Sequence, residues 1–332
     1  MNKQFVIKKN NYQYILSERN ILAELPSNPF VVKLHYAFQT DSKLYLIMDY
    51  LSGGELFYHI RKNGLLVEND CKIYCCELIL GIEFLHKMNI IHRDLKPENV
   101  LLKSNGHICI TDFGLAKELK DGATTRTLCG TSEYMAPEML TKNGYGKAVD
   151  WWSLGALFYE MLNGKAPFTA KTPKELDRKI LTEKLSLPVH LSSNCHSLLK
   201  GMLDRDVNKR LGSAKSTMFS IGGVAALKNH DFFQGIDWLD IHDELYTPPV
   251  IVTNQSTNQP SNQPSNHQSS QLTTPPLTQR SNTSDTTNNL TTNNLPNYLF
   301  NYLSTNLLTN LSTNFFSNEF TNQLISVSIL ED

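Results

Sequence analysis

The sequence has little that would anchor the chain in a membrane or build it around disulfides. No apolar run in its 332 residues reaches the roughly 18 that a membrane-spanning helix needs. The opening residues, MNKQFVIKKN, lack the apolar stretch of a signal peptide. The six cysteines show no paired metal-ligand spacing, and in a chain of this size they do not make a disulfide framework. We therefore expect a cytoplasmic protein with reduced thiols and no membrane span.

A strong charge of either sign is also missing. The 31 Lys and Arg residues and the 32 Asp and Glu residues leave a formal net charge of −1. Proteins that bind nucleic acid or a membrane surface usually carry a marked basic excess. We therefore expect no nucleic-acid partner. The hydrophobic fraction of 40% is sufficient for a buried core.

Charged residues become scarce near residue 250, where the composition changes. From Ile251 onward Asn, Thr, Ser and Gln dominate, with the near-repeat STNQPSNQPSN. Such a segment buries too little apolar surface to offset the entropy of ordering the chain. We predict that residues 255–332 are a mostly disordered low-complexity tail. Docking or a short helix at NYLFNYLSTNLL or NFFSNEF stays open as an alternative.

The first 250 residues carry clear helical and strand patterns. Residues 12–25 repeat apolar positions at helical spacing and stop at Pro26, whereas KLHYAF and KLYLIMDY around QTDS predict a strand pair. Residues 67–88 predict a long amphipathic helix, in which we interpret the three cysteines as packing thiols. Residues 147–162 are apolar nearly all round and predict a buried helix.

The residues suited to chemistry lie between positions 90 and 138. HRDLKPEN places Asp94, Lys96 and Asn99 in one loop between short apolar strands, and DFG follows with Asp112. Asp94 can accept a hydrogen bond from a hydroxyl, and Lys96 can neutralise charge on a phosphoryl group. Asn99 and Asp112 offer hard oxygen atoms to Mg²⁺. This set predicts phosphoryl transfer, because a solvated charged turn would not place carboxylate and amide oxygens at both loops.

Together with CGTSEYMAPE, VDWWSLGALFYEML, NKRLG and KNHDFF, these motifs resemble eukaryotic protein kinases. The likeness is strongest to AGC-group serine/threonine kinases of the ribosomal-protein and Akt types, and it extends to about Pro249. It implies an α+β, two-lobed fold and ATP and Mg²⁺ as cofactors. The implied parts are a small-lobe remnant at 1–50, a helical large lobe at 51–233 and the start of a C-terminal extension at 234–254.

The resemblance also implies roles for particular residues. The catalytic residues are Asp94 and Lys96, the metal ligands are Asn99 and Asp112, and the nucleotide-binding residues are Met48, Asp49, Leu51, Glu55, Leu101 and Glu18. Thr127 is the implied activation-loop phosphorylation site, and Arg93 and Lys117 are the residues that hold its phosphate. The residues implied to bind substrate are Glu55, Glu98, Glu160 and Thr131.

Further implications concern partners and packing. The partners are protein substrates with basic, arginine-containing motifs and an upstream phosphoinositide-dependent kinase. Met48–Leu51 is the implied hinge, with Met48 as gatekeeper. The stacked regulatory spine is assigned to Leu22, Leu34, His92 and Phe113. An ion pair between Glu138 and Arg210 is implied as a structural contact.

One departure from the family concerns the nucleotide clamp. The sequence contains no G-x-G-x-x-G, and the lysine that pairs with the equivalent of Glu18 would fall before Met1. We therefore expect a truncated small lobe, either in a fragment of a longer kinase or in a product that transfers phosphate poorly. Two function classes stay open: a serine/threonine kinase, and a catalytically inactive pseudokinase that acts as a binding scaffold.

Overall fold

The structure is a computed structural model of the 332-residue chain, and it describes residues 1–250 except 10, 121, 142 and 219–220. The chain divides into two units, Met1–Gln259 and Pro260–Asp332, and all described residues belong to the first. The predicted disorder of residues 255–332 lies outside the described residues. Within the described part, no helix is long and apolar enough to cross a membrane.

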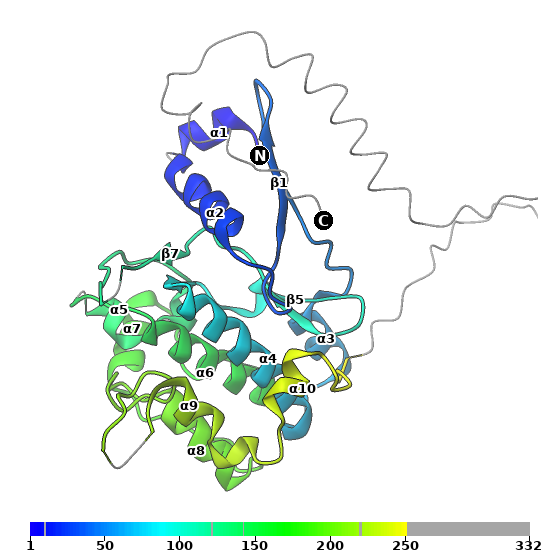
Figure 1. The fold of residues 1–332 in the computed structure, drawn as a ribbon. Helices are drawn as coiled ribbons and strands as arrows, with labels where there is room; N and C mark the ends of the chain where they lie inside the picture. Colours follow the sequence, from blue (N-terminus) through cyan, green and yellow to red (C-terminus); the bar gives the residue numbers. More distant parts are fainter. Residues whose placement is uncertain (10, 121, 142, 219–220, 251–332) are drawn as a thin grey trace, which may run out of the picture. The chain divides into compact units, whose positions relative to one another are not determined.

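The N-terminal elements are two helices followed by a strand pair (Figure 1). Their bounds are α1 Lys3–Lys8, α2 Tyr12–Glu24, β1 Leu34–Gln39 and β2 Leu44–Met48. Helix α2 and the antiparallel pair β1–β2 confirm the sequence prediction. Helix α2 ends just before Pro26, which lacks the N–H that a further turn would need. Helix α1 was not predicted; the side chain of Asn2 caps it by accepting from the Gln4 N–H.

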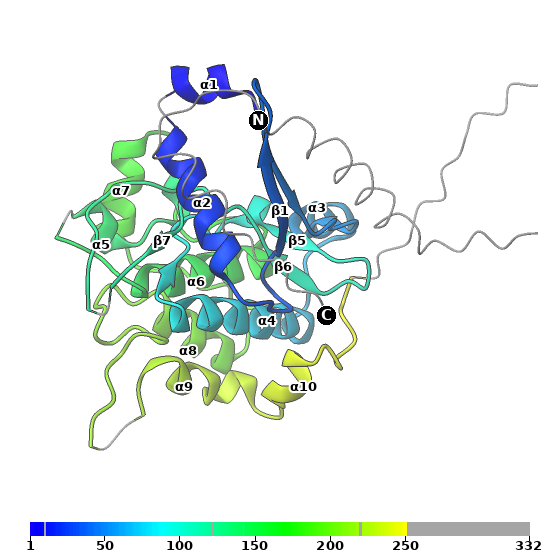
Figure 2. The ribbon, with the colours of Figure 1, turned by 45° about the horizontal axis from the view of Figure 1, so that its top comes forward.

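The remaining elements are mainly helical, with short strands around the HRDLKPEN loop at residues 92–99, which we call the catalytic loop after its predicted role (Figures 1 and 2). They are β3 Gly54–Glu55, α3 Leu56–Asn63, α4 Glu68–Lys87, β4 Ile90–Ile91, η1 Pro97–Asn99, β5 Val100–Leu102, β6 Ile108–Ile110, β7 Lys117–Glu118, η2 Ser132–Tyr134, α5 Pro137–Leu140, α6 Ala148–Asn163, α7 Pro173–Thr182, α8 Ser193–Met202, α9 Gly223–Lys228, η3 Asp231–Phe233 and α10 Trp238–His242. Strands β3, β5 and β6 form one antiparallel sheet in that order, and β4 pairs with β7. The fold is therefore α+β, as predicted.

Helix α6 forms the centre of the helical core. It packs against α4 and α8, and almost every one of its side chains is buried, as its apolar sequence predicts. Cys71, Cys75 and Cys76 of α4 are fully buried, which agrees with their interpretation as packing thiols. Burial raises the pKa of the Cys75 thiol well above its ordinary value, so it stays protonated and unreactive. The core thus gives the catalytic loop a rigid base.

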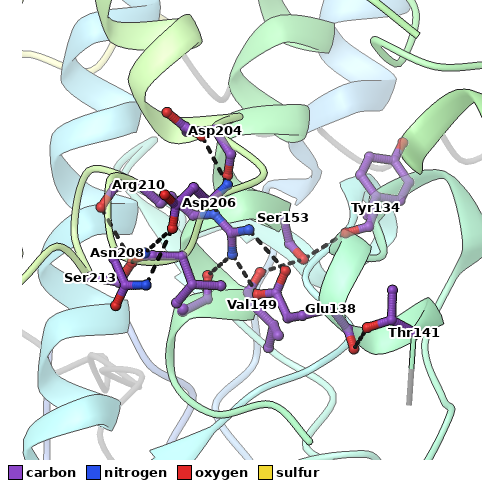
Figure 3. Close-up of polar contacts among 12 residues, drawn as sticks. Tyr134, Glu138, Thr141, Val149, Ser153, Asp204, Asp206, Asn208, Arg210 and Ser213 are labelled. Atoms are coloured by element: carbon purple, nitrogen blue, oxygen red, sulfur yellow. Dashed lines mark hydrogen bonds and ion pairs between the residues drawn. The ribbon is translucent and has the colours of Figure 1, made fainter. Parts of the chain in front are cut away.

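A buried arginine joins the end of the activation segment to this core (Figure 3). Both terminal nitrogens of Arg210 donate to the Glu138 carboxylate, at 2.6 and 2.9 Å, which confirms the predicted ion pair. Arg210 also donates to the carbonyls of Ala148 and Asp204, each at 2.9 Å. Its guanidinium lies over the Trp152 ring, 5.2 Å from the ring centre. Helices α5 and α6 are therefore held by one fully buried side chain.

Candidate active site

The backbone of the catalytic loop is held by a carboxylate that sequence reasoning missed. Asp150 of α6 is fully buried and accepts the N–H groups of His92 and Arg93, at 3.0 and 2.9 Å. The His86 ring lies 2.8 Å from the same carboxylate. Although burial opposes the charge, the hydrogen bond and charge of His86 help keep the pKa of Asp150 below its ordinary value. The signal in the sequence was an aspartate within the otherwise apolar VDWW.

The loop presents Asp94 with most of its acceptor sites already in use. Oδ1 accepts from the backbone N–H of Thr131 at 2.9 Å and from its hydroxyl at 2.8 Å. Oδ2 accepts from Lys96 Nζ at 2.7 Å and, over a longer distance of 3.5 Å, from the side-chain nitrogen of Asn99. A carboxylate has about four lone-pair sites, so a further donor on Oδ2 would have to displace only the long contact from Asn99. Burial opposes the Lys96 charge, but the hydrogen bond to Asp94 raises its pKa, so Lys96 stays protonated. Thr131, Lys96 and Asp94 are thus brought together.

The two residues assigned to metal binding present oxygen atoms near this loop. Asn99 is buried, and its amide N–H donates to the Asp94 carbonyl at 2.9 Å, which leaves its side-chain oxygen able to bind a cation. Asp112 has φ +63°, a left-handed conformation that is uncommon for a residue with a side chain. One of its carboxylate oxygens accepts the Gly114 N–H at 3.2 Å. An amide and a carboxylate oxygen are ligands that fit Mg²⁺.

Glu18 of α2 faces the same place. A carbon built at the missing Cβ of Gly114 would lie 3.2 Å from Asp112 Oδ1 and 3.9 Å from Glu18 Oε2. Burial, together with the negative charge of Asp112, raises the pKa of Glu18 to about 7. No ion pair joins Glu18 to a lysine or arginine within the part of the chain that the structure describes. Among the described residues, this corner of the site therefore holds two neighbouring carboxylates, and the charge of Lys96 acts on one of them, Asp112.

The residues assigned to nucleotide binding lie on two paired segments. In the β1–β2 ladder Leu34 is opposite Met48, and in the β3–β5 ladder Glu55 is opposite Leu101. The structure thus brings Glu55 and Leu101 together, although they are distant in sequence. Met48 is 39% exposed, and its side chain is accessible at the end of β2.

The hinge that follows β2 is fixed by its own aspartate. One carboxylate oxygen of Asp49 accepts the Lys33 N–H at 3.0 Å, and the other lies 2.7 Å from the His35 ring. The Asp49 N–H in turn donates to the Lys33 carbonyl at 3.1 Å. Leu51, the last hinge residue, is half-buried against the core. The backbone of the hinge is thereby tied to the start of β1.

The phenylalanine of the DFG segment is packed against an aromatic ring of the catalytic loop. The Phe113 ring is fully buried and meets the His92 ring edge to face, with centres 5.2 Å apart. Leu22 of α2 is also buried, whereas Leu34 is only partly buried against the core. These are the four residues that the resemblance assigns to the spine, and three of them are in the core.

The activation segment, which runs from DFG at 112–114 to APE at 136–138, exposes Thr127; of its assigned basic partners, Lys117 is exposed and Arg93 is buried. Lys117 Nζ donates to the hydroxyl of buried Thr125, at 3.1 Å, rather than to Thr127. Arg93 Nε donates to the Leu115 carbonyl at 2.6 Å, while its Nη1 is buried and has no partner among the described residues. The Tyr145 hydroxyl, which interacts with Arg93, donates to the Thr127 carbonyl.

The acids assigned to substrate binding differ in exposure. Glu55 and Glu98 are exposed, whereas Glu160 is half-buried and accepts the Tyr134 hydroxyl at 2.5 Å. Burial raises the pKa of Glu160, and so do the nearby charges of Glu98 and Glu133. Glu133 is a further acid that sequence reasoning did not assign. Its position in SEYMAPE, next to Tyr134, was the available signal.

Arg61 of α3 is a positive charge near this acidic group. Its positive charge acts to lower the pKa of Glu160 against the effects of burial and of the neighbouring acids. The arrangement therefore combines three carboxylates with one guanidinium. Such a group can bind a second guanidinium in competition with the first.

The chain is similar in sequence to known protein kinases. The profile described as Protein kinase domain matches residues 1–233. A RAC family serine/threonine-protein kinase homolog of Dictyostelium discoideum is 47% identical over 253 residues, which cover 76% of this chain and 54% of that protein. Serine/threonine-protein kinase Sgk1 of Xenopus tropicalis is 44% identical over 250 residues, 75% of this chain and 58% of that protein.

These relatives agree with the AGC-type resemblance of the motifs. Protein kinase 2 of Dictyostelium discoideum is also 47% identical, over 238 residues that cover 72% of this chain and 48% of that protein. The chain spans about half the length of the curated relatives it matches. Its motifs, its α+β fold and these matches together show that the chain belongs to the protein kinase domain family, in the AGC group.

Proposed function

We propose that the chain is an ATP- and Mg²⁺-dependent serine/threonine protein kinase that acts on arginine-containing substrates in the cytoplasm. The observation that carries the proposal is the Asp94 carboxylate, which is fixed by Thr131 and Lys96 and has one acceptor site on Oδ2 that holds only a 3.5 Å contact from the Asn99 amide. That site suits a serine or threonine hydroxyl, which must be oriented and must give up its proton on attack.

The roles of the protein groups follow from their positions. Bound Mg²⁺·ATP supplies the phosphoryl group and the charge-neutralising cation. Asp94 accepts the hydrogen bond, and then the proton, of the attacking hydroxyl. Lys96 neutralises negative charge beside it. Asn99 and Asp112 would hold the metal, and Met48, Asp49, Leu51, Glu55 and Leu101 would line the nucleotide. The hydrogen bonds of Asp94, Lys96 and Asn99 and the carboxylate of Asp112 support the first four roles.

The first test replaces Asp94. Asp94→Asn in the full chain should reduce phosphate transfer to an arginine-containing peptide by at least about a hundredfold, because general-base catalysis contributes that much or more. Nucleotide-dependent thermal stabilisation should stay unchanged, since Asp94 is not a nucleotide ligand. Transfer by the Asp94→Asn variant at the parent rate would refute the assigned role.

Substrate preference is a separate part of the proposal. Glu55, Glu98 and Glu160 are acids that could bind substrate arginines, and Glu133 adds charge to the same group. A peptide with arginine three residues before the acceptor should be used better than one with alanine there. Glu160→Gln should weaken that preference, whereas Glu175→Gln on exposed α7 is the matched control. Equal use of both peptides by the parent chain would remove the basis for this preference.

Activation by phosphorylation of Thr127 is the third part. Arg93 interacts with Tyr145, whose hydroxyl donates to the Thr127 carbonyl, and Nη1 of Arg93 is buried without a partner among the described residues. A phosphate on Thr127 could give this nitrogen a partner, and this supports Thr127 as the phosphorylation site. An upstream phosphoinositide-dependent kinase should modify Thr127 and raise activity. Thr127→Ala should abolish that response, and Thr124→Ala, on the exposed neighbour, should keep it. A Thr127→Ala chain that is still activated would refute the switch.

The second candidate is a pseudokinase that acts as a binding scaffold. The observation that favours it is Glu18, which lies beside Asp112 without a cationic partner among the described residues and has its pKa raised to about 7. Thermal unfolding with and without Mg²⁺·ATP distinguishes the two candidates. A kinase should be stabilised by nucleotide, whereas absence of both stabilisation and transfer would favour the scaffold.

A further inference from the structure

Asparagine is followed by glycine at four places in the sequence: Asn63–Gly64, Asn105–Gly106, Asn143–Gly144 and Asn163–Gly164. At such a step the glycine nitrogen is not shielded by a side chain, and the backbone can rotate freely. The nitrogen can then attack the side-chain carbonyl of the preceding asparagine. Whether this happens in a folded protein depends on what holds the glycine N–H and the asparagine side chain.

At three of the four steps the glycine N–H donates a hydrogen bond to a backbone carbonyl. The three bonds are Gly64 to Ile60 at 2.9 Å, Gly106 to Lys103 at 3.0 Å and Gly164 to Glu160 at 2.7 Å. Gly64 and Gly164 are C-cap residues of helices, where this bond is part of the helix end. Each bond keeps the proton on the glycine nitrogen, which must lose it before it can attack. These steps are therefore protected.

Asn105 has a second form of protection. Its side-chain nitrogen donates to the Glu244 carboxylate at 2.9 Å, and its oxygen accepts the His107 N–H at 3.3 Å. The side chain cannot turn its carbonyl carbon toward the Gly106 nitrogen without breaking both contacts. Asn105 is therefore a useful internal control.

The Asn143–Gly144 step has neither protection. The Asn143 side chain is exposed, and no hydrogen bond joins it or the Gly144 N–H to another residue in the described ranges. Gly144 has φ +90°, in the left-handed region that glycine adopts without strain. No hydrogen bond with a described residue therefore holds the amide of Asn143 or the nitrogen of Gly144 away from the other.

We propose that Asn143 is a site of spontaneous deamidation and isoaspartate formation. The Gly144 nitrogen loses its proton to solvent base and attacks Cγ of Asn143, and the side-chain nitrogen leaves as ammonia. The resulting five-membered succinimide then adds water. Opening at the side-chain carbonyl gives aspartate, and opening at the main-chain carbonyl gives isoaspartate. The sum is asparagine plus water going to a carboxylate plus ammonia, with no oxidant or cofactor.

The modification would act on the activation segment. The Tyr145 N–H donates to the Thr125 carbonyl and the Thr125 N–H to the Tyr145 carbonyl, each at 2.9 Å. A Cβ at Gly144 would lie only 3.0 Å from the Thr124 hydroxyl, so the two segments touch here. Isoaspartate inserts one methylene into the backbone two residues before Tyr145. The added length should displace Tyr145 from Thr125 and loosen the segment that carries Thr127.

Peptide mapping of the aged full chain tests the site. After incubation at mildly alkaline pH, mass spectrometry and enzymatic methylation of isoaspartate should find the product at Asn143 first, and faster at higher pH. The peptides that contain Asn63, Asn105 and Asn163 should react more slowly in the folded chain and at similar rates in urea. An unchanged Asn143, or four equal rates in the folded chain, would overturn the proposal.

Hydrogen exchange tests the consequence. In the aged parent chain the Thr125 amide should exchange faster than in the fresh chain. Aged Asn143→Gln should not change, because glutamine forms its cyclic imide far less readily. Asn143→Asp adds the charge without the methylene and should behave like the fresh chain. Equal exchange in fresh and aged parent chains, despite isoaspartate at Asn143, would show that the activation segment does not respond.

Discussion

The carboxylates on the two sides of the active site have contrasting surroundings. Asp94 in the catalytic loop and Asp150 of α6, which holds the loop backbone, are both buried, and each is matched by N–H groups or by a positive charge. On the side of α2, Glu18 is next to another carboxylate, Asp112, and burial raises its pKa. In the first region, N–H groups and positive charge balance the carboxylates, and the hydrogen bonds fix their positions. The second has excess negative charge, which suits a divalent cation but costs stability.

The largest expected effect is a loss of stability when the Asp150 carboxylate is removed from the first region. Asp150→Ala would leave the buried N–H groups of His92 and Arg93 without an acceptor and His86 without its partner. We expect the free energy of unfolding to fall by about 3–5 kcal/mol, the usual cost of breaking a buried charged network. Urea unfolding of the full chain measures it.

Two controls sharpen this result. Asp150→Asn keeps an acceptor oxygen and should lose less stability than Asp150→Ala. Asp41→Ala, at an exposed position, should change the unfolding free energy by no more than about 0.5 kcal/mol. If Asp150→Ala lowers the free energy of unfolding no more than Asp41→Ala does, the stability of the catalytic loop does not depend on the Asp150 carboxylate.

A smaller effect is expected from the contact that orients Asp94. Thr131→Val keeps the shape and the backbone N–H but removes the hydroxyl that donates to Asp94 at 2.8 Å. A hydrogen bond to a charged group contributes about 1.5–3 kcal/mol, so transfer should slow by roughly ten- to a hundredfold. The loss should appear in kcat, with little change in KM for nucleotide. Thr131→Ser restores the hydroxyl and should recover most of the rate; an equally slow serine variant would contradict this explanation.

A third effect concerns Glu18 and depends on pH. Its pKa of about 7 in the folded chain exceeds the ordinary 4.5, so between these values the folded state binds more protons than the unfolded state. The contribution of Glu18 to stability therefore decreases as pH rises from about 4.5 through about 7, and is constant above that. Glu18→Gln removes this pH-dependent contribution to stability.

Thermal unfolding at a series of pH values measures the difference. Relative to the parent chain, Glu18→Gln should be more stable at pH 8 than at pH 5. The same comparison for Glu175→Gln, on exposed α7, should give no trend with pH. A difference between the parent and Glu18→Gln that does not vary with pH would mean that Glu18 titrates normally.

Sequence reasoning succeeded where structure is encoded locally and where motifs mark the family. The helix at residues 12–25, the strand pair around QTDS and the buried helix at 147–162 follow from periodicity and from Pro26. The loop that contains Asp94 and Asn99 was recognised because several motifs occur in a fixed order.

Other features depended on contacts between distant segments. The role of Asp150 requires α6 to pack under the catalytic loop, and the contact of Lys117 with Thr125 requires the activation segment to fold back. Helix α1 has only six residues, too few for a periodic signal. The acid Glu133 became recognisable only when Glu160 and Glu98 were found near it.

The contact between Arg210 and Glu138 has a consequence for the time course of folding. Its two residues are 72 positions apart in the chain, so the contact requires closure of a long loop. Contacts of this kind tend to form after local helices have condensed, and interactions absent from the transition state mainly slow unfolding. The buried guanidinium should therefore lengthen the lifetime of the folded chain more than it speeds its assembly.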